Sequence, residues 1–282
     1  MTAQDGEPLV EWFSQADVQA HWDGLPARNE ENERNIDNGG ITGTHLTVGK
    51  SDPFELDFCQ IHARMRAAGF STLSYGAYEM IGQRVLHAYV LRDLAPVSFM
   101  QAYFDGMWYA SDPRFAEVLQ SGFPVAWQLD RLDEEAQRTG DRRALALAAS
   151  LRAHGMNSGV IFSLSAPQLD LSVGVGLTSE LRDADWINDR VVGTALAVSL
   201  AVHRFAQPFV AARVQQVRAV VLDPEQEAVL ERLVQGLPDQ DIADALHLSL
   251  HKVGYHIQTL ERLFKVQNRA QLAYLAARRV RA

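Results

Sequence analysis

The clearest hydrophobic pattern in the chain lies between Gly236 and Arg269. Its apolar residues recur at helical spacing in two runs: Ile242, Ala243 and Leu246, then, after a break at residues 247–249, Val253, Ile257, Leu260 and Phe264. Two short amphipathic helices joined by a turn of about three residues are typical of a helix-turn-helix. Ser249 is placed to cap the second helix, which such motifs lay in a DNA major groove.

The flanking residues predict two further helices. Asp223-Pro224-Glu225-Gln226 has the pattern of an N-cap, a proline at the first helical position and a capping box. This helix should end before Gly236, a C′ glycine. Downstream, Asn268 is placed to cap a last helix, whose apolar face carries Leu272, Leu275 and Ala276. The sequence therefore predicts an all-α, four-helix domain over residues 222–282.

The part of the chain before this domain mixes strand and helix patterns. Strand patterns occupy residues 71–78, 84–91, 123–129, 157–165 and 169–177. Helix patterns occupy residues 53–69, 98–120 with a break near Asp112-Pro113, 133–154, and about 182–205. This order predicts an α/β sandwich, in which a five-stranded, mainly antiparallel sheet lies between helices.

The N-terminal residues 1–52 are expected to be an extension, partly disordered. An apolar-spaced segment from Leu9 to Trp22 reads as a helix, and a polar stretch rich in Asn and Gly follows it. The predicted domains are then the sandwich at 53–206, a linker at 207–221 that begins with Gln207-Pro208, and the helical domain at 222–282.

Composition narrows the class of protein. The 282 residues carry a net charge of −9, 47% are hydrophobic, and Cys59 is the single cysteine, so no internal disulfide can form. No apolar run reaches the ~18 residues of a membrane span, and the first residues lack an export signal, so a cytoplasmic protein is expected. Residues 218–282 hold nine Lys or Arg and eight Asp or Glu, so their net charge is +1, which is low for a DNA-binding domain.

The C-terminal pattern resembles the DNA-binding domain of LuxR-type transcription factors. The residues that match at the family's spacings are Leu222, Val229, Leu230, Gly236, Ile242, Ala243, Leu246, Leu248, Ser249, Val253, His256, Leu260, Val266 and Arg269. The order of elements before them also resembles this family, whose N-terminal sandwich encloses an acyl-homoserine lactone. The resemblance implies a homodimer that binds double-stranded DNA and a small hydrophobic signal molecule, with no other cofactor and no enzymatic activity.

The resemblance carries four ligand-contacting positions over to this chain. Tyr103 stands nine residues before Asp112, Trp127 stands fifteen after it, and Ser172 lies on the last strand. Asp112 is the family's acceptor for a ligand amide N–H, although a residue before a proline can equally cap a helix. Tyr103 and Trp127 can equally be core aromatics, because such side chains bury large areas wherever they lie.

Two positions depart from the family. Phe99 stands where the family has a tryptophan that donates to the lactone carbonyl, and Ala95 stands where many members have a tyrosine. Neither replacement has a donor. The two losses could lower affinity by two or three orders of magnitude, at roughly 0.5–1.5 kcal/mol or more for each bond. We therefore expect a more apolar ligand, or a self-filled pocket, with an N–H or hydroxyl given to Asp112.

The predicted recognition helix supplies the candidate DNA contacts. They are Ser249, His251, Lys252, Tyr255, His256, Gln258 and Arg262. Gly254 costs this helix about 1 kcal/mol relative to alanine and removes a side chain from the DNA face. An alternative therefore stays open: a LuxR-like interaction protein that binds DNA weakly and dimerises with a related regulator as an antagonist.

Overall fold

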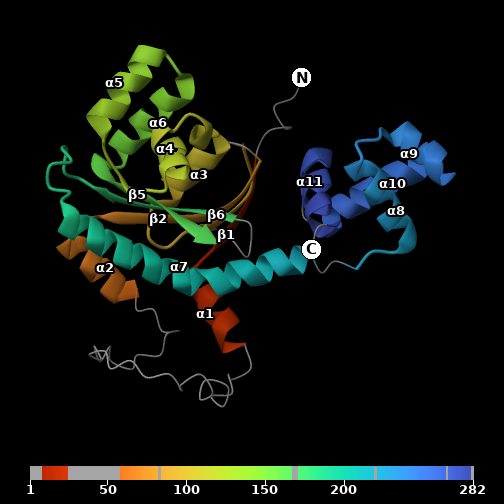
Figure 1. The fold of residues 1–282 in the computed structure, drawn as a ribbon, viewed down its shortest axis with the longest axis horizontal. Coiled ribbons are helices and arrows are strands. Elements are labelled where there is room, and N and C mark those ends of the chain that lie inside the picture. Colours follow the sequence, from red (N-terminus) through yellow and green to blue (C-terminus); the bar gives the residue numbers. More distant parts are fainter. Residues whose placement is uncertain are drawn as a thin grey trace, which may run out of the picture.

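The computed structural model describes six stretches of the chain: residues 8–24, 58–81, 84–166, 171–218, 221–264 and 266–280. The polar stretch after Trp22 and the expected helix start at Asp52-Pro53 lie outside these residues. The described elements form an α/β sandwich followed by a group of helices (Figure 1). The predicted fold class is therefore confirmed.

The sheet of the sandwich has six strands, one more than expected. They are β1 (Leu9–Phe13), β2 (Thr72–Ile81), β3 (Arg84–Leu91), β4 (Val125–Gln128), β5 (Ser158–Ala166) and β6 (Leu171–Ser179), in the order β1-β3-β2-β6-β5-β4. All neighbouring pairs are antiparallel except β1 and β3, which are parallel.

The sixth strand corrects the prediction of a helix from Leu9 to Trp22. Residues 9–13 extend along β3, and Leu9 pairs with His87 at one end of the register. Their side chains alternate: Val10 and Trp12 pack on one core of the sandwich and Phe13 on the other. The helix α1 (Gln15–Asp23) begins only after Ser14, which caps it. The apolar spacing was helical over the whole segment, but the open edge of β3 provides a hydrogen-bonding partner that local spacing does not reveal.

Helices cover both faces of the sheet (Figure 1). One face carries α1, α2 (Phe58–Ala67) and α7 (Asp189–Arg218). The other carries α3 (Val97–Asp105), a 3₁₀ turn at Trp108–Ala110, α4 (Pro113–Ser121), α5 (Leu129–Thr139) and α6 (Arg142–Ala153). Each layer of helices buries its own apolar core against the sheet, so the sandwich has two cores.

Two predicted helix boundaries were wrong. The segment 133–154 forms two helices, because Gly140 takes a left-handed conformation (φ +67°) and Asp141 starts α6 by accepting from Arg143 N and Ala144 N. The last helix of the sandwich does not end near Phe205 but continues through Pro208 to Arg218. Its apolar face keeps packing on the core beyond the proline, which outweighs the lost backbone hydrogen bond.

Helix α7 also has the length and composition of a membrane span. Half of its most apolar window is buried in the fold. Core helices that pack on a sheet share these properties, and among the described residues no other helix has them.

The four C-terminal helices follow the predicted pattern. They are α8 (Pro224–Val234), α9 (Asp239–Leu246), α10 (Leu250–Leu263) and α11 (Arg269–Val280). Asp223 and Gln226 form the capping box of α8, and Ser249 Oγ caps α10 by accepting from Lys252 N at 3.2 Å. Gly236 has φ +85°, as expected for a C′ glycine. One apolar core joins all four helices.

The helical domain contacts the sandwich through α11. Leu86 and His87 of β3 and Leu9 of β1 meet Tyr274 and Leu275 around a small hollow. Leu9 also packs on the core of the helical domain. The N-terminal strand is therefore shared between the two parts of the molecule.

Candidate ligand pocket and DNA-binding helix

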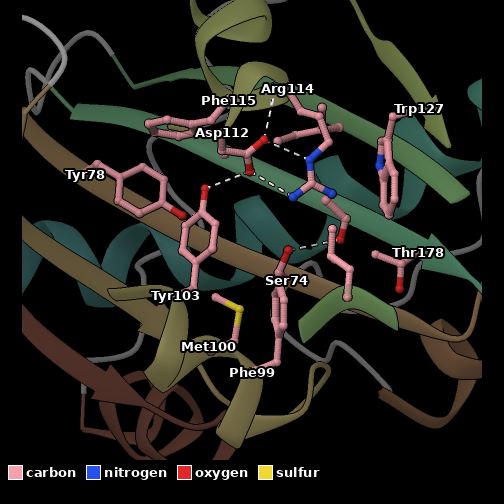
Figure 2. A pocket seen from close by; sticks show the side chains of 14 residues that line it. Ser74, Tyr78, Phe99, Met100, Tyr103, Asp112, Arg114, Phe115, Trp127 and Thr178 are labelled. Carbon is pink, nitrogen blue, oxygen red and sulfur yellow. Dashed lines mark hydrogen bonds and ion pairs between the residues drawn. The ribbon is translucent and has the colours of Figure 1, made fainter. Parts of the chain in front are cut away.

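A pocket lies inside the sandwich, between the sheet and the helices α3 and α4. Its cavity volume, the space in which water molecules could be centred, is about 60 Å³, and the surrounding empty space of about 560 Å³ includes space open to solvent. The lining residues come from six elements and the start of α4 (Figure 2): Ser74, Tyr78, Phe99, Met100, Tyr103, Asp112, Arg114, Phe115, Trp127, Leu151, Ile161, Gly174, Gly176 and Thr178. Most of these side chains are apolar, so the pocket suits a largely hydrophobic molecule.

Asp112 is the centre of a polar cluster in this pocket. It is the N-cap of α4, and its side chain is almost completely buried. One carboxylate oxygen accepts from the backbone N of Arg114 at 3.0 Å and from its Nε at 2.9 Å. The other accepts from Arg114 Nη2 at 2.8 Å and from the Tyr103 hydroxyl at 3.0 Å. Asp112 thus caps α4 and also lines the pocket, and its contact with a ligand stays a prediction.

Arg114 forms the wall between Asp112 and Trp127. Its guanidinium carbon lies 4.4 Å from the centre of the Trp127 ring, and its side chain is 9% exposed (Figure 2). Burial opposes its charge, but the adjacent Asp112 carboxylate more than offsets this and raises the pKa of Arg114. Burial raises the pKa of Tyr103, and the Asp112 carboxylate raises it further, so Tyr103 stays protonated and donates. Asp112 and Arg114 thus form an ion pair of zero net charge inside a largely apolar pocket.

The structure brings together four of the five predicted ligand residues. Phe99, Tyr103, Asp112 and Trp127 all line the pocket. Ser172 lies near the start of β6, opposite Tyr78 on β2, and is not among the lining residues.

Arg114 was missed by the sequence analysis. Its position two residues after a helix-capping aspartate was the available signal, because the side chain can fold back onto the cap. Ala95 packs on the core of this layer without lining the pocket, so it is Phe99 that replaces a donor at the cavity wall.

The second candidate site is the outer face of α10. His251, Lys252, Tyr255, Gln258 and Arg262 are exposed there, and Ser249 caps the helix. His256 is different, because it is 5% exposed and lies 3.3 Å from the Glu225 carboxylate. The helix thus presents five of the seven predicted side chains together, keeps Ser249 at its start, and turns His256 inward.

An ion pair joins the recognition helix to α8. Lys252 Nζ lies 2.7 Å from Glu225 Oε2, and this contact lowers the pKa of Glu225. Arg269, at the start of α11, binds Asp239 and donates to the Leu237 carbonyl at 2.6 Å. Arg269 therefore fixes α11 to α9, whereas Lys252 is held by an acidic neighbour on the exposed face of α10.

The two sites together define a class of protein: a transcription regulator that has both a small-molecule-binding domain and a helix-turn-helix domain. Residues 58–206 match the family described as "Autoinducer binding domain", and residues 221–276 match "Bacterial regulatory proteins, luxR family". The first match alone covers more than half of the chain. The chain belongs to the LuxR family of bacterial regulatory proteins, whose members are transcription regulators and not enzymes.

Comparison with solved structures finds several that are similar to this chain. Escherichia coli SdiA is 20% identical, with 78% of this chain and 88% of that chain covered and a TM-score of 0.45. A structure of SdiA in complex with octanoyl-rac-glycerol is 19% identical, with 78% and 86% covered and a TM-score of 0.45. CepR2 from Burkholderia cenocepacia, described as N-acylhomoserine lactone dependent, is 21% identical, with 55% and 85% covered and a TM-score of 0.42. No curated protein matched the chain.

Proposed function

We propose that this regulator binds a small, largely apolar signal molecule in the sandwich and, as a homodimer, binds operator DNA through α10. The observation that carries the proposal is the presence of both sites in one chain. The pocket has an apolar lining around a single polar cluster, and the helix exposes five polar or aromatic side chains on one face. Ligand that binds only the folded sandwich stabilises it by mass action.

The DNA half of the proposal rests on Lys252, Gln258 and Arg262 as contacts to phosphates and bases, with His251 and Tyr255 beside them. Fluorescence anisotropy on operator-containing duplexes, measured between 50 and 200 mM salt, tests it. Lys252→Ala and Arg262→Ala should each weaken binding, and Arg262→Ala should flatten the log–log salt dependence by about one unit. Lys252→Ala should flatten it less, because Glu225 holds this lysine. Unchanged affinity and slope in both variants would exclude α10 as the DNA contact.

The homodimer is a separate part of the proposal. The apolar face of α11 is not free to form a two-fold interface, because Leu272 and Ala276 are buried inside the helical domain and Leu275 contacts the sandwich. Sedimentation at tens of micromolar (roughly, above common dimer constants) should still show a dimer. A monomer with and without bound ligand would refute this part.

Specific observations favour a second function, that of an interaction protein which binds DNA weakly. Lys252 is neutralised by Glu225, and α10 exposes three large apolar side chains: Leu250 (50%), Tyr255 (58%) and Leu263 (42%). These would suit a protein partner, such as a related regulator, better than phosphates. Weak, salt-insensitive DNA binding together with formation of a mixed dimer would select this alternative.

A further inference from the structure

The acceptor capacity of Asp112 is already filled by the protein. A carboxylate offers about four lone-pair positions. The Tyr103 hydroxyl and three N–H groups of Arg114 supply four donors, each within 3.0 Å of a carboxylate oxygen. An N–H or hydroxyl of a ligand would have to displace one of them. The expectation that the ligand donates to Asp112 therefore conflicts with this geometry.

The charged hydrogen-bonding groups that remain unused at the cluster are donors. A guanidinium has five N–H groups, and Asp112 takes one from Nε and one from Nη2 of Arg114. The other three have no hydrogen-bond partner within the part of the chain that the structure describes, although Arg114 borders the cavity. Two of them, one on Nη1 and one on Nη2, lie along the Nη1–Nη2 edge, which can bind two acceptor oxygens side by side.

The rest of the lining supports this polarity. Ser74 donates its hydroxyl to the Gly176 carbonyl at 3.3 Å, and Thr178 shares a hydrogen bond of 2.5 Å with Thr72. These hydroxyls are thus engaged with the sheet. Donors expected near position 99 are absent, because Phe99 is a hydrocarbon. The open edge of Arg114 is the charged donor that remains on the pocket wall.

We propose that Arg114 is the ligand-binding residue of this pocket, and that the ligand is an apolar chain with an acceptor-only oxygen headgroup, carbonyl or carboxylate. The ligand needs no N–H donor. This inference rests on the proposed small-molecule function and names its chemical class. Arg114 binds the headgroup through its Nη1–Nη2 edge, while Asp112 and Trp127 hold the guanidinium in place.

A matched pair of probes tests the polarity directly. One is N-decanoyl-homoserine lactone, and the other is the same molecule with an ester oxygen in place of the amide N–H. Decanoic acid and methyl decanoate are added as acceptor-only probes that separate carboxylate from carbonyl. Calorimetry on the full chain should show that the ester lactone binds at least as tightly as the amide, and that the acid or its methyl ester binds.

Variants link the binding to the guanidinium. Arg114→Met should weaken the acceptor-only probes about ten- to a hundredfold, the loss expected for a hydrogen bond to a charged group. Arg131→Met, at an exposed position on α5, should leave binding unchanged. If Arg114→Met does not fold, ligand binding is measured on the double variant Asp112→Asn with Arg114→Met, which has no unpaired buried carboxylate.

Three results would overturn the inference: tighter binding of the amide lactone than of its ester, no binding of any acceptor-only probe, or unchanged binding in the Arg114 variants. The assay measures ligand binding alone. If acceptor-only probes bind through Arg114 while DNA binding never responds, the inference holds and the proposed signalling function fails. The two are therefore tested separately.

Discussion

The ion pair between Lys252 and Glu225 leads to a sharp prediction for DNA binding. The two side chains are 46% and 51% exposed, so solvent screens their attraction and a phosphate can compete for the lysine. In Glu225→Gln, Lys252 has no ion-pair partner at position 225 before DNA binds. The net charge of residues 218–282 rises from +1 to +2. One more phosphate contact steepens the log–log salt slope by about 0.9, which is an extra factor of about 3.5 in affinity between 200 and 50 mM salt.

The measurement is fluorescence anisotropy on one duplex across that salt range. Glu227→Gln is the matched control, because it removes the same charge from the same exposed helix without a contact to Lys252. It should raise affinity less and leave the slope unchanged. Equal slopes for wild type, Glu225→Gln and Glu227→Gln would refute the idea that Glu225 restrains the recognition helix.

Three further predictions concern the sandwich. Asp112→Ala should lower the free energy of unfolding by about 3–5 kcal/mol, because it leaves the Arg114 charge buried and unpaired. Urea denaturation measures this loss beside the exposed control Asp130→Ala, and equal unfolding free energies for the two variants would show that the ion pair is dispensable. Burial lowers the pKa of His87 to about 4, below its unfolded value near 6.5, so the unfolded state binds the proton first and stability falls as pH drops from about 6.5 to 4. The loss should reach about 3 kcal/mol and be absent in His87→Phe, and identical pH profiles for both proteins would contradict it. Phe99→Trp should raise lactone affinity about two- to tenfold by restoring a donor, whereas calorimetry showing weaker binding would mean that the indole overfills the site.

The helical domain could be predicted from sequence because its signals are local. The capping box at Asp223 and the cap at Ser249 act within four residues, and the apolar faces repeat within single helices. Strand β1 could not be predicted in this way, since its existence depends on β3, more than seventy residues further along the chain. Pro208 likewise looked like a helix end, but packing of α7 on the core overrides the local preference.

The pocket was predictable in position but not in chemistry. The family resemblance implied that Tyr103, Asp112 and Trp127 line one cavity, where the structure also has them. The sequence does not show that Arg114 folds back onto Asp112, because a charged side chain is by default expected at the surface. The hydrogen-bonding polarity of the site depends on that single conformation.

The position of β1 has a consequence for shortened forms of this protein. The family match begins at residue 58, yet Leu9–Phe13 covers the edge of β3 and Leu9 touches the helical domain. A chain that starts at residue 58 would leave a row of backbone N–H and C=O groups on β3 without partners. Exposed edges of this kind pair with other chains and promote aggregation. The first strand thus protects the sheet against self-association, and its removal should reduce solubility before it affects either binding site.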